Sequence, residues 1–280
     1  MINWLIIDDL ISAFLKEDAP FGDITTDVLI DKKEVSRAEF ILKEDGVVAG
    51  LDVAARVFEL LDDKIIFTKI VPDGSNAKKG TIIAEVAGNT GALLIGERIA
   101  LNILQRLSGI ATKTREFCSK VKGKAVSIAD TRKTTPGMRM LEKYAVRMGG
   151  GSNHRYSLSD GVLIKDNHIV AAGGIKNAVL KAKKAIPHTI RIEVETETIE
   201  QVKEAVEAGA DIIMLDNMSL DMMREAVKII DKRALVEASG NISLDNVYEV
   251  ALTGVDIISV GSLTHSIKSI DISMKILDSQ

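Results

Sequence analysis

The sequence has little of what several classes of protein require. A single cysteine, Cys118, among 280 residues cannot form a disulfide within the chain, which favours a reducing compartment. Aromatic residues make up only 4% and the net charge is −4, so nucleic acid would find neither a stacking platform nor a basic surface. No apolar run approaches the ~20 residues of a membrane span, and the start MINWLIIDDLISAFLKED lacks a basic leader and a cleavage site. We expect a soluble, cytoplasmic protein without nucleic-acid or membrane partners.

The pattern of the chain changes near residue 110. Before this point, helical stretches at residues 3–17 and 52–61 alternate with short apolar runs typical of strands, which predicts a small α+β domain over residues 1–110. From Gly96 to Phe117, apolar residues recur at helical spacing and predict a long connecting helix.

A repeated unit of strand and helix follows over residues 111–265. Six short apolar runs, AVSIAD, GVLIKD, TIRIEV, DIIMLD, ALVEAS and VDIISVG, alternate with amphipathic helical stretches, as in a parallel sheet with crossover helices. Polar or small residues stand at the strand ends at intervals of 21, 23 and 22, namely Glu195, Asp216, Ser239 and Gly261. Such spacing predicts consecutive barrel units whose carboxyl-end rim forms the site. Six strands instead of eight predict an open, incomplete barrel, and a last helix over residues 266–280 would pack back on the first domain.

Basic side chains gather between Asp130 and His168, where seven cations stand against four anions. Arginine offers a planar fork for carboxylate and phosphate and lysine a compact charge, so this segment predicts an enzyme for anionic small molecules. Three of the cations have i, i+4, i+8 spacing, which favours a solvated helix face: Arg139, Lys143 and Arg147. Four others stand at expected element ends, where donors can converge on a ligand: Arg132, Lys133, Arg155 and Lys165.

The rim of the expected barrel reads as a metal and phosphate site. Glu195 and Asp216 lie one unit apart, and Mg²⁺ is typically held by one or two carboxylates with substrate phosphates. Glu193 and Glu195 alternate with apolar residues, so both acids point to the same face of the strand. Burying two carboxylates inside a barrel is costly unless they bind something. The alternative is that both point outward into solvent. Small residues after the last two strands suit a phosphate: Ser239, Gly240, Asn241, Gly261 and Ser262. Nearby His265 could donate to the same anion or be a packed structural histidine.

Several long motifs carry a family resemblance. They are TRKTTPGMRMLEKYAVRMGGGSNHR, LSDGVLIKDNH, EVE followed by MLDN, EASGNI and SVGSLTHS, together with FGDITTD and GERIALNILQRLSGIAT nearer the start. Over nearly the whole chain they closely resemble quinolinate phosphoribosyltransferase, the decarboxylating nicotinate-nucleotide pyrophosphorylase family of NAD synthesis. A family associated with molybdate transport shares TRKTTPG and GGG, but LIKDNH favours the quinolinate enzymes. The fold implied by the resemblance is an N-terminal α/β sandwich followed by an open, incomplete α/β barrel.

The resemblance also implies a reaction and its residues. Phosphoribosyl pyrophosphate and quinolinate would give nicotinate mononucleotide, pyrophosphate and CO₂. The pyridine dicarboxylate would be surrounded by Arg132, His154, Arg155 and Lys165, with Arg98 from the neighbouring subunit of a homodimer. Phosphoribosyl pyrophosphate would meet Lys133 and Lys165, its magnesium and ribose Glu195 and Asp216, and its 5′-phosphate Ser239, Gly240, Asn241, Gly261 and His265. Catalysis would rest on charge placement by Lys133, Lys165, Glu195 and Asp216.

Two alternatives stay open at this point. One is a barrel enzyme for another phosphorylated anion, which would need no dicarboxylate clamp and so would not use Arg132, His154 and Arg155 together. The other is a carrier module, because PDGSNAKKGTIIAEVAG is similar to half of a lipoyl or biotinyl domain. That alternative would require a lysine on a hairpin tip, and Lys78 and Lys79 lack the flanking signature.

Overall fold

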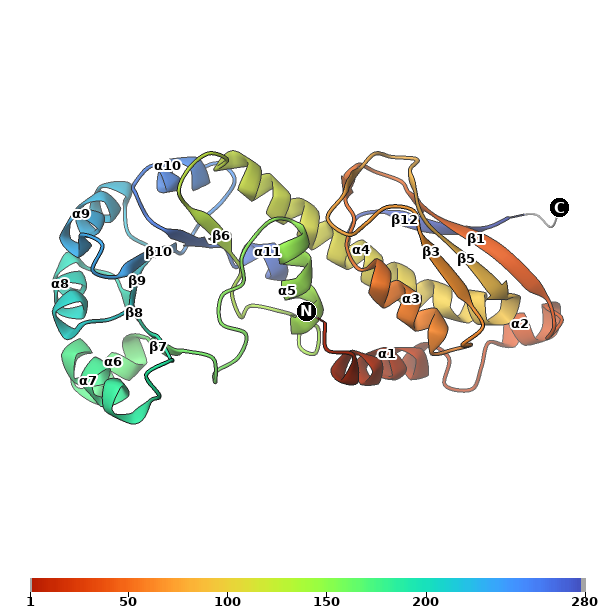
Figure 1. Ribbon diagram of the computed structural model, residues 1–280, viewed down its shortest axis with the longest axis horizontal. Helices are drawn as coiled ribbons and strands as arrows, with labels where there is room; N and C mark the ends of the chain where they lie inside the picture. Colours follow the sequence, from red (N-terminus) through yellow and green to blue (C-terminus); the bar gives the residue numbers. More distant parts are fainter. Residues whose placement is uncertain (1, 278–280) are drawn as a thin grey trace. The chain divides into compact units, whose positions relative to one another are not determined.

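The protein is described by a computed structural model that covers residues 2–277 (Figure 1). Its contacts divide the chain into two compact units. The first holds the described residues up to Arg115, Thr135–Gly150, and the described residues from Ser266 onward; the second holds Glu116–Thr134 and Gly151–His265. The first unit therefore extends beyond the expected boundary at residue 110, to Arg115, and also includes Thr135–Gly150.

An antiparallel sheet of order β12-β1-β5-β3 forms the centre of the first unit. Its strands are β1 (Val35–Leu42), β3 (Ile66–Lys69), β5 (Ile82–Asn89) and β12 (Ile272–Ile276), beside the short pair β2 (Gly46–Val47) and β4 (Asn76–Ala77). The helices of this unit are α1 (Trp4–Asp18), α2 (Ile24–Leu29), α3 (Leu51–Glu59), α5 (Arg139–Met148) and most of α4 (Thr90–Lys120). The mixture of helices and strands predicted for this part of the chain is confirmed.

Aromatic packing joins α3 to this sheet. Alternate residues of β1 are buried, including Phe40, and the buried stripe of α3 ends in Phe58. The Phe40 ring lies 6.1 Å from the Phe58 ring and 5.6 Å from that of Phe67, measured between centroids. Period-two burial on the strand and helical periodicity on α3 thus meet in one apolar core.

The expected helix over residues 266–280 is wrong for the described residues. Residues 272–276 form β12, which pairs antiparallel with β1 from Leu42↔Ile272 to Ala38↔Ile276. Ile270 and Ile272 are buried while Asp271 between them is exposed, a period of two that suits a strand. The open edge of β1 supplies the hydrogen bonds that decide the conformation.

The solvated helix face expected around Lys143 is also wrong. Lys143 on α5 is only 2% exposed and its neighbour Glu142 is fully buried, whereas Arg147 is exposed. The Glu142 carboxylate accepts hydrogen bonds from Arg106, with Nε at 2.8 Å. This side of α5 therefore carries a buried, paired carboxylate and a buried lysine instead of the solvated row of cations that helical spacing suggested.

The second unit is an open parallel sheet of order β6-β11-β10-β9-β8-β7. Its strands are β6 (Ser127–Ala129), β7 (Val162–Ile164), β8 (Ile192–Thr196), β9 (Ile212–Asp216), β10 (Leu235–Ser239) and β11 (Ile257–Ser259). Its helices are α6 (Asp166–Ala172), α7 (Ile175–Ala185), α8 (Ile199–Ala208), α9 (Leu220–Ile230), α10 (Val247–Ala251) and α11 (Ser262–His265). Figure 1 shows α7, α8 and α9 along the outside of the curved sheet. The predicted incomplete barrel of six strands is confirmed, since β6 and β7 form its two edges.

Helix ends in this unit follow local sequence. Thr198 caps α8 through a capping box with Gln201, and Gly209 ends the helix with a φ of 74°. Ser219 caps α9, accepting from the N–H of Met222. Among the described residues, no helix is both long and apolar enough to cross a membrane.

Gly109 marks a close approach between α4 and the segment before β12. A Cβ at this position would lie 2.3 Å from the carbonyl oxygen of Lys268. Alanine normally stabilises a helix interior by up to about 1 kcal/mol relative to glycine. We predict the opposite sign for Gly109→Ala, a loss of about 1 to 3 kcal/mol from overpacking, measured by urea unfolding. Ser119→Ala, at an exposed position of the same helix, is the control and should change stability by less than about 0.5 kcal/mol. A stabilised Gly109→Ala variant would contradict the close approach.

Candidate active site

The carboxyl ends of the parallel strands border a cavity of about 780 Å³ within the second unit. Twelve of the residues expected to act on ligands line it: Arg132, Lys133, His154, Arg155, Lys165, Glu195, Asp216, Ser239, Gly240, Asn241, Gly261 and His265. His265 is exposed on this cavity, so it is not the packed structural histidine of the alternative.

Two guanidinium groups meet on one side of the cavity. Burial lowers the pKa of Arg155, and the positive charge of Arg132 lowers it further. Arg155 donates from Nη1 to the carbonyl of Gly161 at 3.1 Å, while the buried Nε of Arg132 has no hydrogen-bond partner among the described residues. Two cations held close together with an unused buried donor form a site that an anion would stabilise.

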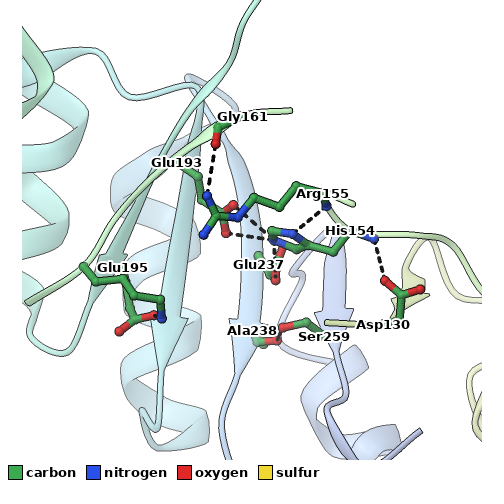
Figure 2. A network of polar contacts seen from close by, with 10 residues as sticks. Asp130, His154, Arg155, Gly161, Glu193, Glu195, Glu237, Ala238 and Ser259 are labelled. Carbon is green, nitrogen blue, oxygen red and sulfur yellow. Dashed lines mark hydrogen bonds and ion pairs between the residues drawn. The ribbon is translucent and has the colours of Figure 1, made fainter. Parts of the chain in front are cut away.

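His154 lies beside Arg155 and faces the buried carboxylates of Glu193 and Glu237, the acidic floor of the cavity (Figure 2). Its main-chain N–H donates to Asp130 Oδ1 at 2.9 Å, and the N–H of Arg155 donates to its Nδ1 at 2.8 Å. Because Nδ1 accepts a hydrogen bond, the neutral ring carries its proton on Nε2. Nε2 lies 3.1 Å from Glu193 Oε2 and 3.6 Å from Glu237 Oε1. The ligand atoms of these three side chains lie within 4.8 Å of one another, and Glu193 is close enough to accept a hydrogen bond from Nε2.

The carboxylates at the mouth of the cavity come from neighbouring strands. Glu195 on β8 pairs with Lys165, and Asp216 ends β9. Glu193 is 4% exposed and Glu195 lines the cavity, so both acids face inward as Figure 2 shows. The outward alternative is therefore wrong. Oxygen donors of this kind suit Mg²⁺, and Lys165 forms an ion pair with one of them, Glu195.

A backbone cradle lies beyond β9 and β10. Gly240 has a φ of 87°, and a Cβ on it would lie 2.2 Å from Oδ1 of Asn217. Asn217 and Asn241 have φ values of 53° and 52°, and the Asn241 amide donates to Asn217 Oδ1 at 2.9 Å. Only glycine fits between these side chains, and turned backbone of this kind exposes N–H groups to an anion.

The end of β11 closes the same region. A Cβ at Gly261 would lie 3.0 Å from Cδ of Lys133 and 3.3 Å from Cδ2 of His265. Thr264 donates through Oγ1 to the carbonyl of Lys133 at 2.7 Å. Lys133 is thereby anchored through its backbone while its exposed side chain lines the cavity.

Three cavity or support residues were not predicted as functional. They are Asp130, Asn217 and Glu237. Strand parity could have identified Glu237, which stands two residues before Ser239 on β10 and therefore on the same face. Asn217 follows Asp216 directly, and asparagine is one of the residues that tolerates positive φ.

Arg98 belongs to the other compact unit. It is exposed on α4 and lines a separate cavity of about 290 Å³, together with Phe14, Glu17, Asp18 and Arg106 among others. Within one chain, Arg98 is not among the residues that line the larger cavity.

An open barrel whose rim combines paired arginines, carboxylates and a glycine-built cradle defines a class of α/β-barrel enzymes for phosphorylated and carboxylated substrates. Sequence comparison makes the assignment specific. Residues 23–108 match the model of the quinolinate phosphoribosyl transferase N-terminal domain and residues 110–275 that of its C-terminal domain. The chain belongs to the quinolinate phosphoribosyltransferase family.

Individual relatives agree over almost their whole length. The chain is 47% identical to the probable nicotinate-nucleotide pyrophosphorylase [carboxylating] of Bacillus subtilis, covering 98% of this chain and 95% of the relative. It is 45% identical to the protein of the same description from Synechocystis, covering 98% and 94%. The crystal structure of NadC from Streptococcus pyogenes superposes with a TM-score of 0.95 at 42% identity, covering 99% of each chain.

We predict that Gly240→Ala disrupts the cradle. The new Cβ must displace Asn217, and the positive φ is strained for alanine by about 1 to 3 kcal/mol. Calorimetric titration with inorganic phosphate should show affinity weakened about tenfold or more, since 1.4 kcal/mol corresponds to a factor of ten. Gly254→Ala is the matched control, because Gly254 has a φ of 95° but its Cβ would meet only Val227 Cγ1 at 3.3 Å. Equal phosphate affinity in the two variants would contradict the role of the cradle.

Proposed function

We propose that this chain transfers the phosphoribosyl group of phosphoribosyl pyrophosphate to quinolinate and decarboxylates the product, giving nicotinate mononucleotide, pyrophosphate and CO₂ in NAD biosynthesis. The observation that carries the proposal is that one cavity contains two different anion sites. One is formed by Arg132 and Arg155, which lie close together and leave the buried Nε of Arg132 without a hydrogen bond among the described residues. The other is the backbone cradle around Gly240. The first arrangement suits a dicarboxylate and the second a phosphate. The names of the relatives as carboxylating pyrophosphorylases support the same reaction.

The dicarboxylate contacts follow from charge. Arg132 and Arg155 hold the two carboxylates, and Lys165, now paired with Glu195, turns to the same substrate. His154 supports this group from the floor of the cavity. Removing either arginine would leave a substrate charge without its partner.

The remaining rim residues receive phosphoribosyl pyrophosphate. The 5′-phosphate lies against Ser239, Gly240 and Asn241 after β10 and against Gly261 and His265 after the adjacent β11. Lys133 meets the pyrophosphate, and Glu195 and Asp216 meet the ribose and a magnesium ion. Bound Mg²⁺ would supply charge neutralisation for the leaving pyrophosphate.

The protein residues act mainly by orientation and charge placement. The pyridine nitrogen attacks C1 of the ribose while pyrophosphate leaves, so no protein nucleophile is required. The positive ring nitrogen then stabilises the electron pair left at C2 when CO₂ departs, and a proton completes the product. Lys133 and Lys165 stabilise the negative charge that develops on the leaving group.

We place this activity in the cytoplasm, in a homodimer whose sites are completed by the partner's Arg98. The single cysteine is consistent with a reducing compartment. The overall test is incubation of the purified protein with quinolinate, phosphoribosyl pyrophosphate and Mg²⁺, followed by product analysis. Nicotinate mononucleotide and CO₂ in equal amounts are expected, and their absence would refute the proposal.

Arg155→Ala tests the dicarboxylate clamp. We expect a loss of about 2 to 5 kcal/mol in quinolinate binding, as when one partner of a buried charge pair is removed. Binding of phosphoribosyl pyrophosphate should change far less in the same calorimetric experiment. Arg155→Lys should also bind quinolinate poorly, because a point charge cannot replace the bidentate fork. Equal losses for both ligands would show that the clamp is assigned wrongly.

Asp216→Ala tests the metal site. The Mg²⁺ concentration for half-maximal rate should rise, while quinolinate affinity measured without metal stays nearly unchanged. Asp245→Ala, an exposed acid outside the cavity lining, provides the control for removal of one charge in the same unit. An unchanged Mg²⁺ dependence in both Asp216→Ala and Glu195→Ala would assign these carboxylates to another role.

Subunit mixing tests the shared site. Arg98→Ala and Lys133→Ala homodimers should each be nearly inactive, because one loses a carboxylate contact and the other a pyrophosphate contact. In a mixed dimer, one site collects both defects and the other has neither. Equal mixing with complete exchange should give about half heterodimers and recover roughly a quarter of wild-type activity. If demonstrated exchange recovers nothing, Arg98 does not act across an interface.

A further inference from the structure

Glu237 is a buried acid on the cavity floor that the reaction scheme above leaves without a role. It lies on β10, is 1% exposed, and lines the cavity beside His154 and Glu195. Its Oε1 has no hydrogen-bond partner among the described residues, and His154 Nε2 is 3.6 Å away. Burial of a carboxylate with one oxygen left without a hydrogen bond disfavours its charged form.

One acid, one hydroxyl and one apolar side chain face Glu237 from the surrounding strands, and His154 faces it from the loop before β7. Glu193 faces it from β8, Ser259 from β11, and Met214 occupies the paired position on β9. The His154 ring accepts the Arg155 N–H at Nδ1, so Nε2 is the ring nitrogen that carries a proton toward the two carboxylates. Its protonated Nε2 is closer to Glu193 than to Glu237.

These surroundings move the protonation of Glu237 into the physiological range. Burial, and then the negative charge of Glu193, raise the pKa of Glu237 to about 7, although His154 and Ser259 act in the opposite direction. Below this pH the carboxyl is mostly neutral, and above it the floor of the cavity gains one negative charge.

We propose that Glu237 is a proton-linked specificity residue of the dicarboxylate pocket, so that quinolinate binds together with one proton held on the Glu237 carboxyl. This inference rests on the proposed function. Quinolinate is a dianion at neutral pH, and an ionised Glu237 beneath His154 would repel it. By reciprocity, the bound dianion raises the proton affinity of Glu237, and the neutral acid can donate a hydrogen bond within the floor.

The sign of the pH dependence follows directly. Free protein below pH 7 already carries the proton, so binding takes up almost none and affinity is at its maximum. Above pH 7 the proton must be acquired on binding, so affinity should fall, by up to about tenfold per pH unit for one linked proton. Glu237→Gln keeps the size of the side chain and removes the charge, so it mimics the protonated form at every pH.

The experiment is isothermal titration with quinolinate at pH 6.0, 7.5 and 8.5, in two phosphate-free buffers of different ionisation enthalpy and with a chelator present. Proton uptake by the wild-type protein should rise from near zero toward one across this range. Glu237→Gln should show no uptake and nearly constant affinity. Glu249→Gln is the matched control, because Glu249 is exposed on α10 and its variant should behave as the wild type does.

The outcomes separate the two proposals. Quinolinate binding without proton uptake by the wild-type protein overturns the role of Glu237 and leaves the proposed function intact, whether or not the variant folds. Undiminished uptake by folded Glu237→Gln also overturns it, because the proton then resides on another group such as His154. Failure of quinolinate to bind the wild-type protein at any pH overturns both proposals.

Discussion

Parallel pairing in the second unit is the constraint on which the candidate site depends. Ser239 on β10 pairs with Asp216 on β9, and Thr196 on β8 pairs with Leu215. Because parallel strands in this register end together, polar groups more than forty residues apart in sequence, from Glu195 to Ser239, reach one rim. A register shift of one residue would turn them toward the outer helices.

Some charged side chains at the rim of the cavity have a partner of opposite charge, and others do not. Lys165 compensates Glu195, and Asp130 is occupied by the backbone of the segment that carries His154. Arg132 and Arg155 instead repel each other: burial lowers the pKa of Arg155, and the charge of Arg132 lowers it further. The protein therefore spends stability to keep an anion site ready, and a bound dicarboxylate would relieve the repulsion.

Sequence patterns were sufficient for features that repeat and insufficient for features that depend on distant partners. The near-equal intervals from Glu195 to Gly261 predicted the strand ends, because each strand and helix unit has a similar length. The same periodicity rules failed at β12, whose conformation depends on the edge of β1, and at Lys143, which is buried against tertiary neighbours. The position of Glu237 on the same face as Ser239 could be predicted, but its chemistry could not, because burial and the approach of Glu193 and His154 are not visible in the sequence.

The pairing of β12 with β1 also constrains the order of events during synthesis. The sheet of the first unit needs residues 35–42 and residues 272–276, which leave the ribosome at opposite ends of translation. In the intervening second unit, the strands from β7 to β11 pair in sequence order and can do so while the chain is still growing, whereas β6 must wait for β11. The strand β1, which carries Phe40, therefore has one unpaired edge until β12 has been synthesised. The long sequence separation between β1 and β12 slows folding, and the unpaired edge can pair with other nascent chains.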